Sequence, residues 1–348
     1  MPAFLRSLCV AAATTLWLAS AQAGMAPRYA VTDLGNFFAT GVNDDGWVTG
    51  YDGRALLWRP DTGLQVLAAC TGCSNRATAI NNAGQAVGYA WNAALVGYRA
   101  VMWLPEGGLL DLGDLERGGN NSRADAVNAF GMAAGRASGQ YQGHPQYGNQ
   151  GFLHAASFLP GGGAADLEPY AAGTLNSIGR GINDAGLVVG ERNTSDGWRA
   201  IVWGAGGSAL DLGAAWGLGG TGAQSNSFAR DVNNAGWVAL QLPLGGGEFT
   251  AAVWDAGAGF TVIDRLPGAS TAVANALNDD GVVVGSAGLK AFAWTFETGT
   301  VELTTRLDPV LGAGWSILDA YGISEGGLIV GRITAEQRAA AGIGEDLL

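Results

Sequence analysis

Histidine, cysteine and charge are all scarce in this sequence. Its 348 residues include two histidines and three cysteines, and only 14% of the residues are charged. The two histidines, His144 and His154, are too few for a histidine-rich metal site or a Ser-His-Asp triad. No GxSxG elbow, phosphate-binding loop or HExxH sequence occurs either. We therefore expect a protein without catalytic residues, cofactor or metal.

Long apolar runs are absent after the first 23 residues. Within those residues, Arg6 precedes an apolar run from Leu8 to Leu18, and Ala21-Gln22-Ala23 forms an A-x-A site. This pattern is typical of a secretory signal peptide, here cleaved after Ala23. The run is shorter than the roughly 20 residues that span a bilayer. We expect an exported chain, extracellular or periplasmic, with no transmembrane segment after cleavage.

The charge balance is acidic. The net charge is −12, and loss of Arg6 with the leader would change it to −13. An acidic surface repels phosphate backbones, so nucleic acid is not an expected partner. With 48% hydrophobic residues, the chain can form a packed core, and disorder is not expected.

Glycine is abundant, and much of it lies in a repeat. It accounts for 58 of 348 residues, against roughly 7% on average. Seven segments share an apolar residue, Asn, two turn residues, Gly and an apolar run, with Ser324 replacing the last Asn. These segments are 41–50, 79–88, 126–135, 181–190, 231–240, 276–285 and 322–331. Asn at the first turn position and a left-handed Gly predict a three-residue hairpin with a G1 bulge. A second Gly ends most copies, where we expect backbones to approach closely.

An aromatic strand follows each of the first six hairpins. It reads RALLW at 54–58, RAVMW at 99–103, HAASF at 154–158, RAIVW at 199–203, TAAVW at 250–254 and KAFAW at 290–294. A further strand follows, as in LLDLG at 109–113. One unit therefore holds about four short strands in about 47 residues. The aromatic residues recur in register, so we assign them to the core.

This period predicts an all-β fold, a β-propeller of seven blades with about four strands each. The segment 29–35 reads as the last strand of a unit, whereas 322–331 is a hairpin without an aromatic strand. We expect these two to pair and close the ring. Six or eight blades also fit, and a β-solenoid is the rival architecture. The expected boundaries are a signal peptide at 1–23, one propeller domain at 24–335 and a tail at 336–348.

These repeats resemble the HAF-repeat family of predicted extracellular bacterial proteins. That family carries a His-Ala-Phe tripeptide ahead of a Trp strand, and an A-x-x-IN-x-x-G-x-VVG hairpin. The matching tripeptides here begin at Arg54, Arg99, His154, Arg199 and Lys290, so the family's His is mostly Arg or Lys. The resemblance covers nearly the whole chain after the leader. It implies secretion and a propeller-like fold, and it implies no reaction.

A few residues stand outside the repeat and are candidates for a special role. Cys70 and Cys73 share one predicted loop and favour a local disulfide in an oxidising compartment. Free thiols, or a redox or metal-binding role, are the alternatives. The candidates for a ligand surface are His144, in a polar insertion, and four tryptophans outside the repeat register: Trp91, Trp198, Trp216 and Trp315.

The predicted function is binding. We expect an exported scaffold whose loops at one end of the ring contact a glycan or protein ligand. A propeller-fold carbohydrate-active enzyme, either hydrolase or lyase, and a purely structural envelope or matrix component are the alternatives. The fold alone does not decide among them.

Overall fold

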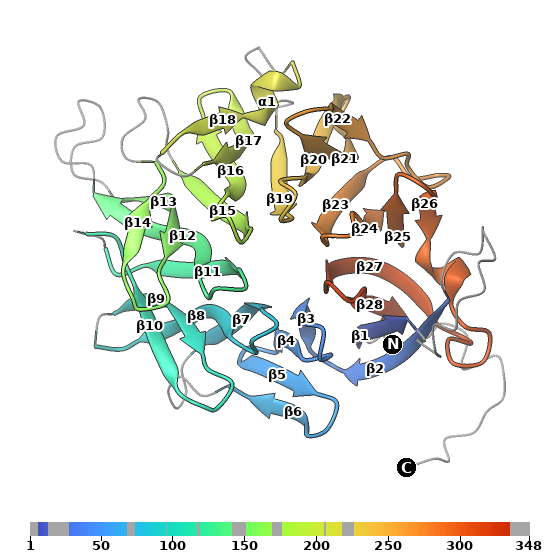
Figure 1. The fold of residues 1–348 in the computed structure, drawn as a ribbon, viewed down its shortest axis with the longest axis horizontal. Coiled ribbons are helices and arrows are strands. Elements are labelled where there is room, and N and C mark those ends of the chain that lie inside the picture. The colour runs from blue at the N-terminus through green and yellow to red at the C-terminus, as the bar shows by residue number, and fades with distance from the viewer. Residues whose placement is uncertain are drawn as a thin grey trace.

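The computed structural model describes residues 6–12, 28–67, 74–94, 96–116, 119–140, 151–168, 176–204, 207–217 and 226–334. Four-stranded antiparallel sheets stand radially around a central axis (Figure 1). The expected all-β propeller is therefore confirmed. Among the described helices, none is long and apolar enough to cross a membrane.

Six blades are each made of four strands that follow one another in the chain. They are β3 (Phe38–Val42), β4 (Val48–Tyr51), β5 (Ala55–Arg59), β6 (Gly63–Val66); β7 (Asn75–Ile80), β8 (Ala86–Asn92), β9 (Gly97–Trp103), β10 (Leu109–Gly113); β11 (Ser122–Val127), β12 (Ala133–Gln140), β13 (Gly151–Phe158), β14 (Ala164–Asp166); β15 (Ser177–Ile182), β16 (Val188–Thr194), β17 (Gly197–Trp203), β18 (Ala209–Asp211); β19 (Phe228–Val232), β20 (Val238–Gly245), β21 (Glu248–Asp255), β22 (Gly259–Val262); and β23 (Ala272–Leu277), β24 (Val283–Ala287), β25 (Lys290–Thr295), β26 (Gly299–Glu302). A short helix, α1 (Leu212–Ala215), follows β18, and a 3-10 turn, η1 (Leu303–Arg306), follows β26.

The remaining strands come from both ends of the chain and form what we call the composite sheet. They are β1 (Arg6–Ala12), β2 (Tyr29–Gly35), β27 (Ser316–Ile323) and β28 (Ile329–Thr334), in the order β2-β1-β28-β27. We expected seven blades from seven hairpins. Six blades, not seven, contain one whole repeat, and the seventh hairpin shares its sheet with the two N-terminal strands.

The predicted direct pairing of 29–35 with the C-terminal hairpin is wrong. β1 lies between them and pairs antiparallel with both β28 and β2. The reason lies in the order of strands within a blade. A hairpin supplies the first two strands, and β2 matches the fourth, so a third strand must separate them. β1 falls inside the predicted signal peptide, whose removal stays a prediction.

The hairpins turn as the repeat predicts. In the first one, Gly46 N donates to Asn43 O, Asn43 N donates to Trp47 O, and Gly46 has a φ of +74°. The other six hairpins repeat these bonds. The second Gly of the repeat faces a bulge in the first strand. A Cβ atom on Gly190 would lie 1.9 Å from Ile178 O, so the expected close approach is confirmed there.

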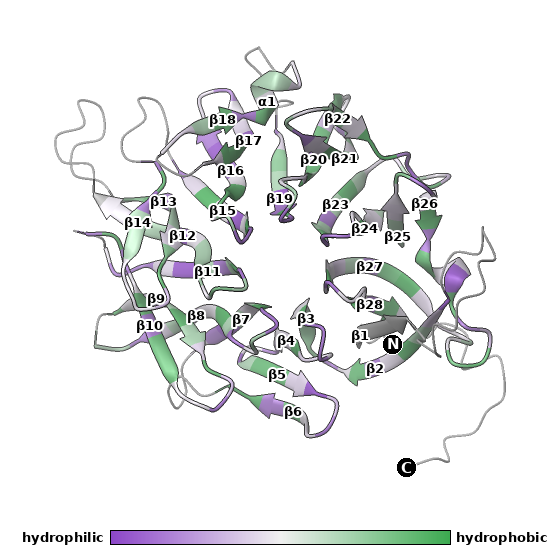
Figure 2. Cartoon of the chain, viewed as in Figure 1, coloured by the Kyte–Doolittle hydropathy of each residue, from purple (hydrophilic) through white to green (hydrophobic). Residues whose placement is uncertain are grey.

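Apolar residues concentrate in the strands and hydrophilic ones in the connecting loops (Figure 2). Core clusters join neighbouring blades; Val253 of β21 and Phe292 of β25 belong to one of them. The repeated tryptophans Trp103, Trp203 and Trp294 are buried, as predicted. Burial of apolar surface between adjacent sheets thus holds the ring together.

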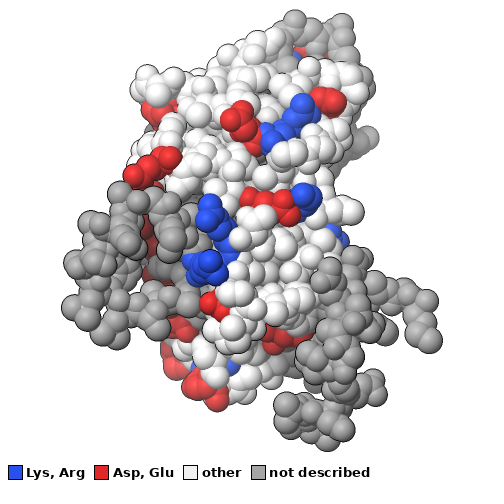
Figure 3. All heavy atoms as spheres, turned by 90° about the vertical axis from the view of Figure 1, so that its right-hand side faces the viewer, with Lys and Arg blue, Asp and Glu red and all other residues white. Residues whose placement is uncertain are grey.

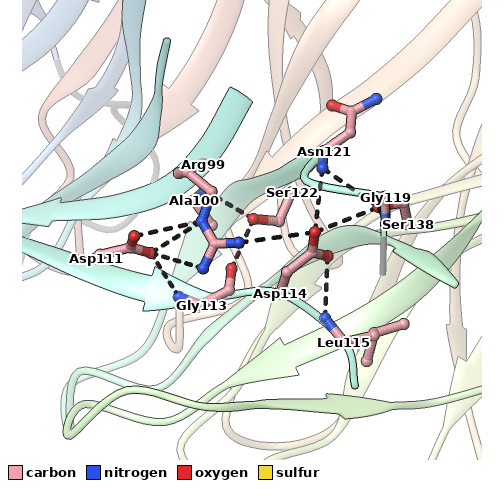
Figure 4. A network of polar contacts seen from close by, with 10 residues as sticks. All are labelled: Arg99, Ala100, Asp111, Gly113, Asp114, Leu115, Gly119, Asn121, Ser122 and Ser138. Atoms are coloured by element: carbon pink, nitrogen blue, oxygen red, sulfur yellow. Dashed lines mark hydrogen bonds and ion pairs between the residues drawn. The ribbon is translucent and has the colours of Figure 1, made fainter. Parts of the chain in front are cut away.

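Polar contacts link the third and fourth strands and latch one blade to the next. The basic residue before the repeated Ala pairs with an acid 12 residues later, as in Arg99–Asp111 and His154–Asp166. His154 is therefore structural, as expected. Figure 4 shows the latch between the second and third blades, where Ser122 Oγ donates to Gly113 O and accepts from Ala100 N.

Candidate functional site

The two faces of the ring differ in the lengths of their connections. All inner strands end in the Asn hairpins, which lie together on one face, here called the turn face. Since the strands alternate in direction, the links from second to third strand and from blade to blade lie on the opposite, loop face. Connections on the turn face within the six blades take five residues or fewer, whereas sixteen residues separate β18 from β19. Ligand contacts are commonest on long loops held by a rigid scaffold.

The hairpin asparagines form a hydrogen-bonded belt on the turn face. Each side-chain Nδ2 donates to the backbone oxygen of the equivalent residue in the next sheet, from Asn43 to Asn81 and onward to Asn128, Asn183, Asn233, Asn278 and Ser324. Each Asn Oδ1 accepts from the backbone N–H four residues later, as from Leu187 to Asn183. The repeated Asn therefore both shapes its own turn and links neighbouring blades.

The residue after the Asn adds carboxylates to the same face, at Asp44, Asp184, Asp279 and Glu325. These carboxylates accept hydrogen bonds from backbone N–H groups of adjacent turns. One such bond, from Gly326 N to Asp44 Oδ1 at 2.5 Å, joins the first hairpin to the last. Asp44 and Asp279 thus act in turns, in agreement with their place in the repeat.

A cavity of about 490 Å³ runs along the axis between the inner strands. Each inner strand has a bulge three residues before its hairpin Asn or Ser. The residues at these bulges all line the cavity and are all polar: Thr40, Thr78, Asp125, Arg180, Arg230, Asn275 and Tyr321. We call them the bulge ring. The sequence predictions missed it, although polar residues at a fixed offset from the Asn were a usable signal.

The smaller members of the bulge ring link adjacent blades. Thr40 Oγ1 donates to Ala77 O at 3.0 Å, Thr78 Oγ1 to Ala124 O at 2.8 Å, and Asn275 Nδ2 to Ala320 O at 2.8 Å. The larger members carry the charge. Arg180 Nη2 lies 2.6 Å from Glu191 Oε1, and Arg180 Nη1 lies 3.9 Å from Asp125 Oδ2.

Five arginines from four successive blades are here called the arginine arc: Arg76, Arg123, Arg136, Arg180 and Arg230. Arg180 and Arg230 line the cavity. The charges of Arg123 and Arg180 act on Arg136. Arg76 and Arg123 both approach the Tyr89 ring. Arg180 lies three positions before its hairpin Asn, or about 10 Å at roughly 3.3 Å per residue. The arc therefore lies toward the loop face. The channel has the carboxylates of Asp184, Asp279 and Glu325 at its turn-face end. At the bulge level it is lined by Arg180 and Arg230 together with Asp125 and Asp231.

Aromatic rings support the arc. The Arg76 guanidinium carbon lies 3.6 Å from the centroid of the Tyr51 ring. That of Arg123 lies 4.4 Å from Tyr89 and 5.1 Å from Tyr98. Stacked guanidinium groups are attracted by the ring faces and keep their planes fixed. The rings thus hold the guanidinium groups in place.

The arc is positive in an acidic protein. Asp125 and Glu191, the acids named beside it, both pair with Arg180. Burial lowers the pKa of Arg136; Asp125 opposes this, and the charges of Arg123 and Arg180 lower the pKa further. Among the described residues, no acceptor meets the buried Nε of Arg136 or of Arg230. On the side of the ring seen in Figure 3, by contrast, acidic and basic side chains are interspersed.

Asp231, next to the bulge, is the unusual acid of the channel. Its position holds Gly or Ala in the other inner strands. Burial raises the pKa of Asp231 to about 7, although the N–H groups of Leu277 and Val232 donate to its carboxylate and oppose the shift. The negative charges of Glu325 and Asp279 raise it further. Close to neutral pH, both the protonated and the ionised forms of Asp231 are therefore populated.

The predicted ligand-surface tryptophans are not brought together. Trp91 packs edge-on against Tyr98, 5.2 Å between centroids, and so lies beside the arc. Trp198 lies in β17, Trp216 Nε1 donates to Pro243 O, and Trp315 packs on the core cluster of the composite sheet. Cys70, Cys73, His144 and the cleavage site after Ala23 lie outside the described residues. Within the described part of the chain, no three His, Cys, Asp or Glu residues are placed to hold a metal ion.

Comparison with known proteins shows the fold alone. No family model and no curated protein matches the chain. The β-propeller domain of the Trilobed protease from Pyrococcus furiosus, described as having an open velcro topology, is 11% identical with a TM-score of 0.50, over 86% of this chain and 97% of that one. A catalytically inactive virginiamycin B lyase from Staphylococcus aureus is 9% identical with a TM-score of 0.46, over 86% and 95% of the two chains.

Proposed function

We propose that this chain is an exported, non-catalytic binding propeller, related to the HAF-repeat proteins, that takes an anionic glycan at the arginine arc. The observation that carries the proposal is the gathering of five arginines in neighbouring blades, two of which, Arg180 and Arg230, line the channel. Among the described residues, the acids paired with the arc are Asp125 and Glu191, and the buried Nε groups of Arg136 and Arg230 meet no acceptor. Planar guanidinium groups bind carboxylates in a bidentate manner. A glycan containing uronic acids would supply carboxylates at several points along the arc.

The size and polarity of the channel agree with this ligand. Its volume of about 490 Å³ falls within the roughly 300–1,000 Å³ usual for small-ligand sites. The carboxylates of the turn face would repel an anionic chain. We therefore expect the ligand to enter from the loop face and to stop at the bulge ring.

The test is calorimetric titration of the purified protein with oligogalacturonate and with its methyl ester, which has the same sugars without the charge. We expect binding of the acid, weakening with added salt, and at least tenfold weaker binding of the ester. Arg230→Gln should weaken binding of the acid about tenfold, since a hydrogen bond to a charged group contributes about 1.5–3 kcal/mol. Lys290→Gln, which removes one charge from the outer pair with Glu302, should bind as the parent does. Equal binding of acid and ester would refute the arginine arc as an anion site.

Turnover of a bound glycan is the second candidate, favoured by Asp231. A carboxyl group with a pKa near 7 is suited to general acid catalysis at neutral pH. Asp231→Ala would then abolish product release from oligogalacturonate while calorimetric binding persists. If the parent protein releases no product from this substrate, the uronate-cleaving activity is refuted.

A further inference from the structure

The third-strand position of the composite sheet is occupied by a segment that the exported protein would lose. β1 covers Arg6–Ala12, inside the predicted leader. Its partners are well defined: Ser7 pairs with Arg332 of β28, and Leu8 pairs with Gly331 of β28 and with Asp33 of β2. Removal of the leader would leave a gap one strand wide between β28 and β2. Unpaired backbone on both edges would be costly and prone to association.

β1 occupies the register of the aromatic strand. In the complete blades, the repeated Ala pairs with the residue eight positions after the hairpin Asn, as Ala100 pairs with Tyr89 and Ala200 with Glu191. The equivalent of these partners in the composite sheet is Arg332, and it pairs with Ser7. The sequence from Arg6, RSLCV, therefore stands where the others have RALLW or RAVMW.

A second segment of the chain carries the same pattern. Four residues after β28 the sequence reads Arg338-Ala339-Ala340-Ala341-Gly342, which matches the basic residue and Ala of the repeat. It lies 14 residues after Ser324, and in the complete blades the corresponding interval ranges from 11 residues to 26. With Arg338 opposite Ile333, a four-residue loop would connect it to β28, a length usual in β-hairpins.

The two edges of the gap are fixed without β1. β27 and β28 pair with each other over their whole length. β2 is held by Asp308 N, which donates to Tyr29 O at 2.8 Å, and Tyr29 is buried in a cluster with Ile317 and Ile329. The slot would thus keep its width after the leader leaves.

We propose that this slot is a strand-exchange site. The leader segment Arg6–Ala12 fills it in the precursor, and Arg338–Gly342 of the same chain fills it after cleavage. The short link to β28 gives the tail a high effective concentration at the slot. The tail would then complete the composite sheet with the hairpin–strand order of the other blades. This inference rests on the export part of the proposed function and is independent of the ligand.

The experiment uses the exported protein and begins with its mass, which reports whether the first 23 residues are gone. A Val330→Cys, Ala341→Cys variant puts the two thiols at directly opposed positions of the expected register. Non-reducing peptide mapping should find the 330–341 link in the cleaved chain. The control Val330→Cys, Ala340→Cys should not link, because a one-residue shift turns the side chain to the other face. Blocking cleavage with Ala21→Arg, Ala23→Arg should prevent the 330–341 link as well, since β1 then stays in the slot.

Hydrogen exchange supplies a second measurement that needs no cysteine. Amides of β2 and β28 should be protected in the cleaved parent and should exchange at least tenfold faster in an Ala340→Pro variant. If the exported chain is cleaved but lacks the 330–341 link, and Ala340→Pro leaves the hydrogen-exchange rates unchanged, the strand exchange is refuted while export still holds. An uncleaved exported chain overturns both.

Discussion

Asp231 makes the stability of this propeller depend on pH in an unusual direction. Buried acids that are ion-paired or hydrogen-bonded often have lowered pKa values, and stability is then lost in acid. Here the folded pKa of about 7 exceeds the ordinary value of 3.8, so between about pH 4 and pH 7 the folded state binds the proton that the unfolded state releases. The stabilisation that Asp231 contributes is therefore fully present below about pH 4 and is lost as the pH rises through about 7.

The magnitude follows from the shift. About three pKa units at 1.36 kcal/mol each give about 4 kcal/mol. The carboxylate borders the channel solvent, which screens part of this energy, so we expect about 2–4 kcal/mol. Replacement by Ala, the residue at this position in the second, third and sixth blades, removes the titrating group. It also removes the acceptor for Leu277 N, at a cost of about 1 kcal/mol.

We predict that Asp231→Ala is slightly less stable than the parent at pH 4 and more stable by about 1–3 kcal/mol at pH 8. Urea unfolding followed by tryptophan fluorescence, repeated at several pH values, gives the difference in unfolding free energy between variant and parent. Asp61→Ala, at an exposed turn, is the control and should show a flat difference. A difference for Asp231→Ala that stays constant from pH 4 to pH 8 would refute the reasoning.

Two further substitutions test the scaffold. Asn183→Ala removes the acceptor of Leu187 N and the donor to Asn233 O, and should lower the unfolding free energy in urea by about 2–3 kcal/mol. Asn183→Ser, which copies Ser324, should lower it less. Equal losses for the two variants would contradict the role of the belt. Gly190→Ala places a Cβ 1.9 Å from Ile178 O and should lower the melting temperature by several degrees. Gly161→Ala, whose Cβ would meet nothing within 4 Å, should not lower it.

The sequence predicted those features that depend on local turn chemistry. The left-handed Gly46 and its six equivalents, the hairpins, and the buried tryptophans all follow from residue types at fixed spacing. The order of strands in the composite sheet could not be predicted in this way, because it depends on which segment of the chain occupies the third-strand position between β28 and β2. Local pattern alone cannot choose between two segments that both fit the same register.

The site was also hidden by the repeat itself. Residues outside the repeat, such as Trp216 and Trp315, looked distinctive in sequence but serve the packing between neighbouring sheets. The arginine arc depends on residues that are ordinary within each repeat and become a cluster only when the ring closes. Arg76, Arg123, Arg180 and Arg230 are 47, 57 and 50 residues apart in sequence. Within one blade, only Arg123 and Arg136 of the arc occur together.

The bulge explains why polar side chains collect at one level of the channel. In a regular strand, each side chain is committed to a sheet face and therefore to the packing between blades. The bulge adds one residue that opposes no partner. At this position the seven inner strands carry three hydrophilic side-chain types, Thr, Asp and Asn, besides the two arginines and Tyr321. The flanking positions serve the fold in other ways: the Asn forms the belt, the apolar residues pack in the core, and the Gly allows the strands to approach closely. The residue three before the Asn is thus an inner-strand position that can vary in chemistry without loss of the fold. Thr78→Arg, which gives up the bond to Ala124 O, should therefore add a sixth guanidinium to the arc, on the same strand as Arg76, and strengthen calorimetric binding of oligogalacturonate.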